Sequence, residues 1–376
     1  MHFTIATMDA NRSQSTTIPG ELTQQLRWST QEPGGCLECS FRLLLPLRTV
    51  PAAIGANYDL RILDHRGCFW RGRIERIQAV RTGAGEWWDV VAVGYGASLS
   101  DQVDNTENLA NTVTTTGISN VIGTWAPAVQ KTTIEASGIT LTNTAAIPRA
   151  WDTPAERINF LKAFGYSDNS QMLAHIYPDN TADANIELTV KKRPSTADYR
   201  AYLGDIQGSW GFDFASYANA VTVVYNAGAS NLTRTYTLGQ NKHPGGVNMA
   251  KVKLLSVPEI TNSADATYIA DAALLKARSL RMVAQSIVMP ISARLTDANG
   301  QDEDVYRLRS GKILQLVDMR PESQSNIAWN NACLITRTDW DNDAETLHIT
   351  PEGLDSGIDA LVSRIRNASE AGSRIV

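Results

Sequence analysis

The sequence predicts an α+β chain that is mostly β, with two β-barrel domains and a mixed α/β central segment. Two sets of short apolar–polar alternations separated by turn residues, one toward each end of the chain, predict the barrels. Two helices, recognisable from their apolar spacing and start signals, predict the helical part. A length of 376 residues exceeds one ordinary domain, so several domains are expected.

Four parts are expected along the chain. They are an N-terminal β-barrel domain at 1–100, an inserted α/β domain at 101–195, a second β-barrel domain at 196–350 and a C-terminal helix or tail at 351–376.

Strands are expected in the first domain wherever apolar and polar residues alternate. The run Asp-His-Arg-Gly at 64–67 is a turn by composition, and a second turn at 81–86 is rich in Gly. The strands expected between residues 20 and 100 cover 41–47, 58–63, 69–77 and 87–93.

The next segment, residues 101–150, is rich in Asn, Thr, Ala and Ser and shows weak periodicity, which is typical of an insertion. A short strand pair is expected there over 134–141, around Ser137 and Gly138. A helix follows, because Thr153 and Glu156 have the spacing of a capping box with Pro at the first helical position. Gly165 is expected to end that helix in a left-handed conformation.

The longest helix is expected over residues 263–281. Apolar side chains recur there at the spacing of one helix face, and the small Ala residues would let the helix lie close against a sheet. The residues of this stripe are Ala266, Ile269, Ala270, Ala273, Leu274, Ala277 and Leu280.

The remaining expected elements are mostly strands. A turn is expected at 297–300, where Asn-Gly favours a hairpin, and a short final helix would carry Leu354, Ile358 and Leu361 with Ile365. The expected strands cover 186–190, 200–206, 220–225, 287–295, 305–309, 313–317 and 332–338, the last paired with 345–349.

Composition excludes several classes of function. The formal net charge is -5, and the clustered Lys and Arg that bind a nucleic-acid backbone are missing. The first residues lack a basic flank followed by an apolar run, and no apolar stretch is long enough to span a bilayer, so a protein made in the cytoplasm is expected. The four cysteines are too sparse for a disulfide framework.

Motifs that could carry chemistry are incomplete. Cys36 and Cys39 have the spacing of a zinc pair, but no second pair exists, and residues three apart on a strand point to opposite faces. We therefore expect unbridged, metal-free thiols. The acidic run Asp339–Asp341–Asp343 with Glu345 lacks the Gly and Glu that a calcium loop requires, and the cluster at 297–304 fails the same test. No histidine or serine stands in a catalytic motif, so no catalytic, cofactor-binding or metal-binding residue is predicted.

The nine tryptophans exceed what a core of this size needs. Trp28, Trp87, Trp88 and Trp210 lie in or near expected strands. Core packing, subunit interfaces and a carbohydrate-binding surface are all uses of such residues.

A family resemblance rests on three stretches. They are residues 18–41, with Trp28 and Pro-Gly-Gly-Cys at 33–36; residues 58–76, with Trp-Arg-Gly-Arg-Ile at 70–74; and residues 264–318, with Tyr-Arg-Leu-Arg-Ser-Gly-Lys-Ile at 306–313. Together with the helix and strand at 153–177, they resemble minor tail and baseplate-hub proteins of long-tailed bacteriophages. Ser310 and Lys312 depart from the run that is usual in that family.

The resemblance implies a tail-hub fold whose two β-barrels are related to tail-tube proteins. It implies a structural subunit, not an enzyme, made in the host cytoplasm and located at the virion's tail tip. The subunit would form a homo-oligomeric ring, expected to be a homotrimer, that joins the tail tube to host-contacting parts. Expected partners are the tail tube or distal tail protein, the tape measure and tail fibre or tip proteins, with no cofactor and no membrane insertion.

Further expectations concern DNA and two alternative functions. DNA would pass through the ring without specific binding, so its lumen should be neutral or acidic. The acidic tips at 302–304 and 339–343 are candidates for channel or rim positions, and outward exposure to solvent is the alternative. A host-recognition, carbohydrate-binding tail protein would instead expose coplanar Trp side chains. A tail-associated cell-wall hydrolase would need a cleft with two carboxylates or a zinc ion.

Overall fold

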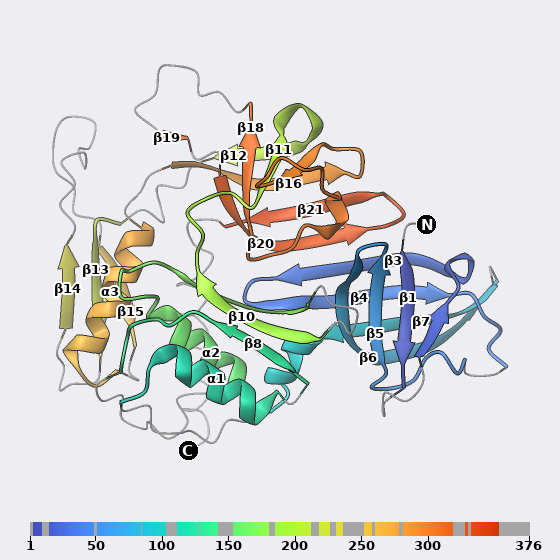
Figure 1. Cartoon of the computed structure of the whole chain (residues 1–376), viewed down its shortest axis with the longest axis horizontal. Coiled ribbons are helices and arrows are strands. Elements are labelled where there is room, and N and C mark those ends of the chain that lie inside the picture. The colour runs from blue at the N-terminus through green and yellow to red at the C-terminus, as the bar shows by residue number, and fades with distance from the viewer. Residues whose placement is uncertain are drawn as a thin grey trace.

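The chain is described by a computed structural model (Figure 1). The described residues are 3–9, 15–48, 51–83, 85–102, 111–126, 128–141, 153–179, 185–211, 218–225, 231–235, 252–257, 260–277, 281–318, 328–329 and 332–352.

The N-terminal β-unit is a run of antiparallel strands in the spatial order β2–β1–β5–β6–β7–β4–β3. Its core is built from alternating inward side chains such as Leu60, Ile62 and Ile74, each 0% exposed. The strands expected from the sequence between 58 and 93 are confirmed. The bounds are β1 Thr4–Met8, β2 Ser15–Ile18, β3 Thr23–Gln31, β4 Gly34–Leu43, β5 Asp59–Asp64, β6 Gly67–Thr82 and β7 Gly85–Gly94, with short 3-10 helices at Gly20–Leu22 and Tyr95–Leu99.

The C-terminal β-unit has the order β12–β16–β21–β20–β18–β11–β17, with β19 beside β16. The expected pairing of 332–338 with 345–349 is confirmed as β20 and β21, and the turn at 297–300 closes with the N–H of Gly300 donating to the carbonyl of Asp297. The bounds are β11 Tyr199–Tyr202, β12 Gln207–Gly211, β16 Arg281–Pro290, β17 Leu295–Asp297, β18 Ile313–Val317, β19 Ala328–Trp329, β20 Ala332–Asp341 and β21 Thr346–Pro351, with 3-10 helices at Leu203–Asp205 and Val305–Arg307.

The two β-units lie side by side and share one hydrophobic core, in which residues of both units pack together (Figure 1). A mostly β, α+β architecture is therefore confirmed. No strand pairing within the described ranges closes either unit into a barrel.

A helical module lies away from the place where the two β-units meet, and it has a core of its own (Figure 1). Helices α1 and α2 pack on each other, and α3 covers the small sheet β14–β13–β15. The predicted packing of the 263–281 stripe on a sheet is confirmed for Ala266, Ile269, Ala270, Ala273 and Leu274, all buried. The bounds are α1 Thr114–Trp125, β8 Lys131–Ile134, α2 Pro154–Ala163, β9 Met172–Pro178, β10 Ile186–Lys192, β13 Ala220–Val224, β14 Asn231–Thr235, β15 Val252–Ser256 and α3 Ser263–Ala277.

Strand β9 separates the cores, and all its side chains are buried for that reason. Met172, Ala174 and Ile176 belong to the core of the helical module, while Leu173 and Tyr177 pack toward the β-units. A short parallel pairing of β9 with β4 fixes this position. It requires glycine at Gly35, where φ is +87° and a Cβ would lie 1.9 Å from the carbonyl oxygen of Ile176.

Several sequence expectations are corrected. Helix α1 lies in the segment 101–150, where no helix was expected; its Thr and Gly residues have low helix propensity, but packing of its buried face outweighs that preference. The strand expected at 305–309 begins as the 3-10 helix Val305–Arg307. The long helix ends at Ala277, and residue 281 already begins β16.

Other boundaries also differ. The strand pair expected over 134–141 is absent from these described residues: β8 ends at Ile134 and pairs in parallel with β10. The strands expected at 41–47 and 200–206 end early, at Leu43 and Tyr202. The final helix expected around 354–365 lies outside the described residues.

The helix at 153–165 follows its local signals. Thr153 accepts a hydrogen bond from the backbone N–H of Glu156, and the Glu156 carboxylate accepts one from the Thr153 N–H, which confirms the capping box. Gly165 has φ of +68°, as predicted.

Candidate functional site at the junction of the two β-units

The two β-units are joined edge to edge through β3 and β20. Their antiparallel pairing places Trp28 opposite Trp340 and Thr30 opposite Thr338. The two threonine hydroxyls lie 2.7 Å apart in a buried hydrogen bond. This pairing makes one continuous sheet out of strands from the two ends of the chain.

An aromatic cluster fills the space beneath this pairing. Trp28 and Trp340 stack with ring centroids 5.5 Å apart and an interplanar angle of 24°. Phe3 meets Tyr306 edge to face at 4.6 Å, and Phe69 lies 5.2 Å from Trp28. Because these rings come from both β-units, they hold the units in one relative position.

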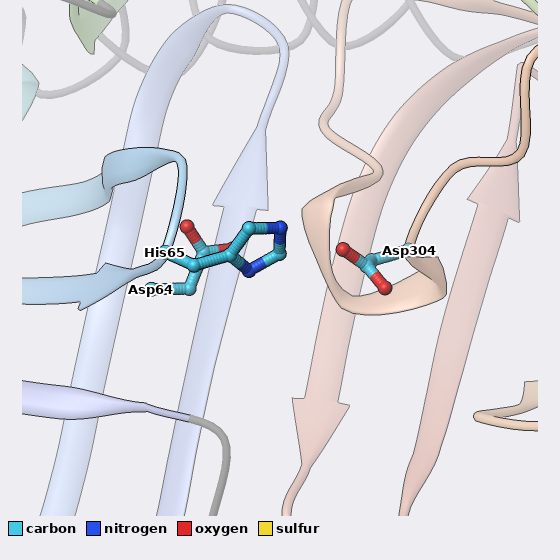
Figure 2. Close-up of side chains that lie close together, drawn as sticks. All are labelled: Asp64, His65 and Asp304. Carbon is cyan, nitrogen blue, oxygen red and sulfur yellow. The ribbon is translucent and has the colours of Figure 1, made fainter.

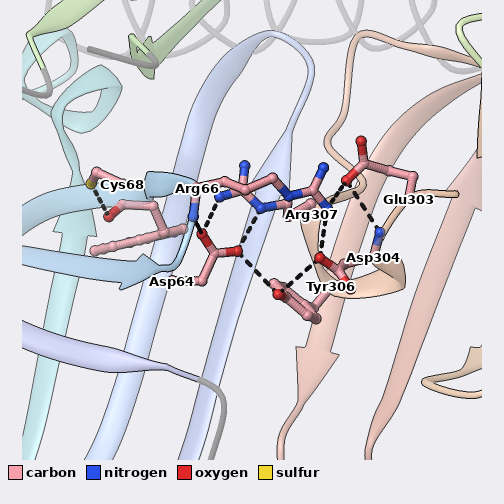
Figure 3. Close-up of polar contacts among 8 residues, drawn as sticks. Asp64, Arg66, Cys68, Glu303, Asp304, Tyr306 and Arg307 are labelled. Carbon is pink, nitrogen blue, oxygen red and sulfur yellow. Dashed lines mark hydrogen bonds and ion pairs between the residues drawn. The ribbon is translucent and has the colours of Figure 1, made fainter. Parts of the chain in front are cut away.

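A polar cluster, here called the clasp, connects the β5–β6 turn to the segment before β18 (Figure 3). It consists of Asp64, Arg66, Glu303, Asp304, Tyr306 and Arg307. Arg307 donates from Nε to Asp64 Oδ2 at 2.6 Å and from Nη2 to Asp64 Oδ1, a two-point contact. Arg66 crosses in the other direction, with its Nη2 2.6 Å from both Glu303 Oε1 and Asp304 Oδ2.

The clasp keeps Asp64 ionised although its side chain is 0% exposed. Burial raises the pKa of the Asp64 carboxyl, but hydrogen bonds from Arg307, the Arg66 backbone and Tyr306 outweigh it, so the pKa lies below its usual value. The Tyr306 hydroxyl is 3.0 Å from Asp64 Oδ2 and 3.1 Å from Asp304 Oδ2. Each carboxylate in the clasp therefore has a cationic or hydroxyl partner.

Asp64, His65 and Asp304 could also be considered as metal ligands, because one ligand atom of each lies within 4.8 Å of the others (Figure 2). The two carboxylates are already bonded to Arg307, Arg66 and Tyr306, and His65 is exposed. A cation there would compete with two guanidinium groups. The arrangement is thus better suited to holding the two β-units together.

The cysteines lie in the cores and are free, as predicted: Cys36, Cys39, Cys68 and Cys333 are all buried. Burial raises the pKa of Cys36 to about 11 and those of Cys68 and Cys333 to about 12, which disfavours the reactive thiolate. The expectation that Cys36 and Cys39 point to opposite faces is wrong. A β-bulge between them pairs Cys39 with Trp28 and Cys36 with Thr30, so both face the same core.

The acidic runs have local partners. Asp341 lies 2.8 Å from Arg27, and Arg337 holds Asp339 at 2.7 Å. Oδ1 of Asp341 accepts hydrogen bonds from the backbone N–H groups of Asp343 and Ala344, as in a turn. These carboxylates thus stabilise hairpin ends and are partly neutralised there.

Several tryptophans are core residues. Trp28, Trp70, Trp88 and Trp340 are at most 8% exposed, and Trp87 is half-buried under the guanidinium of Arg42, 4.1 Å from the ring centroid. The side chain of Trp210 lies outside the described residues. The described tryptophans therefore do not form an exposed sugar-binding row.

Sequence reasoning missed the clasp. The turn at 64–67 and the run at 306–313 were both recognised, but Asp64 and Arg307 are 243 residues apart. The only local signal was the concentration of charge in those two short runs.

The fold is similar to those of phage tail proteins. A tail protein from Neisseria meningitidis is 11% identical, with a TM-score of 0.62, and the match covers 95% of this chain and 98% of that one. The 43 kDa tail protein of the prophage MuSo2 from Shewanella oneidensis is 10% identical, with a TM-score of 0.59 and coverage of 94% and 99%. The prophage tail protein gp18 from Listeria monocytogenes is 10% identical, with a TM-score of 0.57 and coverage of 98% and 99%.

No protein-family model and no curated protein sequence matches the chain. The chain nevertheless has the fold of phage tail proteins over nearly its whole length. The predicted resemblance is confirmed at the level of the fold. In the described part of the chain, no helix is long and apolar enough to cross a membrane.

Proposed function

We propose that this protein is a structural subunit of a phage tail tip, of the baseplate-hub or minor-tail class, and not an enzyme. The observation that carries the proposal is the edge-to-edge joining of two β-units through β3 and β20, in a fold shared with phage tail proteins. A rigid pair of β-units can present two equivalent surfaces to a tube above it. We infer that these units correspond to two tail-tube-like barrels.

The proposed assembly is a homotrimeric ring. Three copies with two β-units each would match a sixfold tube, because a repeated contact closes into a ring when its rotation divides the circle. Its partners would be the tail tube or distal tail protein, the tape measure and tail fibre or tip proteins. DNA would pass through without specific binding, and the ring would be part of the virion, after synthesis in the host cytoplasm.

The polar clusters support a structural role. The clasp carboxylates bond to arginine and tyrosine, and the acidic runs at 297–304 and 339–343 engage nearby arginines or backbone N–H groups. A hydrolase would instead hold carboxylates or a metal toward a substrate cleft. The acidic tips remain candidates for channel or rim positions.

The proposal is tested by determining the mass of the purified full chain in solution and by labelling virions with gold-linked antibody against it. We expect a trimer at micromolar concentration, or on addition of tail tube protein, and label at the distal end of the tail. Label on the capsid, or single copies away from the tail axis in a virion reconstruction, would contradict the proposal.

A further inference from the structure

A second charged contact lies where β9 separates the cores. Glu32, directly after β3, reaches Lys162 of α2 and His175 of β9. These side chains are 4%, 13% and 7% exposed, respectively, so the contact is almost dry. It connects the N-terminal β-unit to the helical module.

The hydrogen bonds of this contact are incomplete. Glu32 Oε1 accepts from Lys162 Nζ at 2.5 Å and from the backbone N–H of Ala174 at 3.2 Å. Glu32 Oε2 and His175 Nδ1 are 3.7 Å apart, beyond a hydrogen bond, and both are buried without a partner among the described residues. Gly311 of the C-terminal β-unit packs closely against this contact, since a Cβ at position 311 would lie 3.0 Å from His175 Nδ1.

The charged groups around His175 determine whether protonation of its buried imidazole is favourable. Lys162 already neutralises the carboxylate of Glu32, and Lys191 of β10 and Lys312, which precedes β18, add positive charge from two further elements. Asp198 bonds to Lys312 at 3.3 Å, and the Tyr177 ring lies 5.0 Å from the His175 ring. A protonated His175 would face one shared carboxylate and three lysines.

We propose that Glu32, Lys162 and His175 form an acid-sensitive latch that holds β9 between the cores and loosens when His175 takes up a proton. At neutral pH the pair Glu32–Lys162 is balanced and the imidazole is neutral. In acid, the added positive charge meets only the carboxylate of Glu32, which Lys162 already neutralises. Strand β9 and helix α2 then open locally to let the ring reach water.

The direction of the effect follows from linkage. Burial lowers the pKa of His175 below its usual 6.5; Glu32 opposes this shift, and Lys191 and Lys312 add to it. In the opened state the ring takes up its proton at the usual pKa. The stability of the latch is therefore complete above the usual pKa and is lost as pH falls from there through the lowered one.

The test is hydrogen exchange of the full chain at about pH 7.5 and about pH 5.5, with correction for the intrinsic pH dependence of exchange. We expect protection of the amides in 172–178 to fall severalfold between these conditions, with about tenfold as the limit, because the open state gains at most a factor of ten per pH unit below its usual pKa. His175→Gln should reduce this change to less than about twofold. His348→Gln, at an exposed position on β21, is the matched control and should behave as the unaltered protein.

Two results would overturn the latch. One is protection in 172–178 that does not change with pH in the unaltered chain, and the other is an unchanged acid response in His175→Gln. If that variant does not fold, histidine-labelled protein followed by NMR gives the same answer. A His175 ring that titrates at or above 6.5 in the folded protein would contradict the proposal.

Discussion

The junction of the two β-units and the packing surfaces of α3 and α1 in the helical module are both buried, but side chains of different size meet there. The junction uses large rings, with Trp28 and Trp340 at 4% and 2% exposed, together with the Asp64–Arg307 ion pair. The contacts of α3 and α1 use small residues: Ala270 and Ala273 lie on the buried face of α3, and Gly117 of α1 sits against Leu161. Lost volume and lost charge should therefore harm the junction most, and added volume should harm the module most.

The largest effect is expected for Trp340→Ala. The substitution removes a buried indole that stacks on Trp28, leaves a cavity where both β-units meet, and should lower the free energy of unfolding by about 4 kcal/mol. Chemical denaturation measures this loss. Trp87→Ala, at the half-buried ring under Arg42, is the control and should cost clearly less. Equal losses in the two variants would mean that the junction is not a special site of packing.

The next effect is expected for Arg307→Met. This change leaves the buried carboxylate of Asp64 without its two-point partner and should cost about 3 kcal/mol at neutral pH. The loss should shrink in acid. The lowered pKa of Asp64 contributes stability that is complete above the usual value of 3.8, and this stability disappears as the pH falls through the lowered value, where the carboxyl of the folded chain takes up a proton.

A double-mutant cycle isolates the ion pair. Asp64→Asn in the Arg307→Met background should cost much less than in the unaltered chain, because the buried charge has already lost its partner. Additive losses in urea melts would show that the two residues act independently and that the clasp does not couple the β-units.

A smaller effect, of the opposite kind, is expected for Ala273→Leu. Ala273 is 1% exposed on the face of α3 that packs against β13, so a larger side chain should destabilise the fold by about 1–3 kcal/mol through overpacking. Thermal unfolding measures it, with Leu275→Ala at a 36% exposed position as the reference. An unchanged melting curve for Ala273→Leu would remove the contrast between module and junction.

The smallest effect is expected for Arg337→Gln. Arg337 and Asp339 form an ion pair near the junction, but their side chains are 47% and 40% exposed. Water screens such a pair, so its loss should change stability by less than about 1 kcal/mol. A change as large as that of Arg307→Met would show that position in the fold matters more than burial.

Features that depend on neighbouring residues could be predicted from the sequence, whereas features that depend on distant residues could not. The start of α2 depends on Thr153, Pro154 and Glu156, which are neighbours, and it was predicted correctly. Strands β5, β6 and β7 of the N-terminal β-unit were also predicted, because alternation is a local pattern, whereas β1, β2 and β3 were not. The bulge that turns Cys36 and Cys39 to one face depends on pairing with β3 and was not visible in advance.

The missed elements depend on tertiary packing. Helix α1 contains Thr115 and Gly117, which weaken a helix in isolation, and it is stable because its buried face meets α2. The clasp and the Glu32–Lys162–His175 latch join residues more than a hundred positions apart. Their members are ordinary charged residues, and only the fold brings them together.

The pairing of β3 with β20 has a consequence for synthesis of the chain. Thr30 and its hydrogen-bonded partner Thr338 are 308 residues apart, so the ribosome must translate nearly the entire intervening chain before β3 finds its neighbour. At the usual pace of about 5–20 residues per second, that interval lasts roughly 15–60 s. For this time the edge of β3 offers unpaired N–H and C=O groups to any other nascent strand. Copies made side by side on one messenger are therefore most prone to mispair through β3, and slower translation should lengthen that exposure.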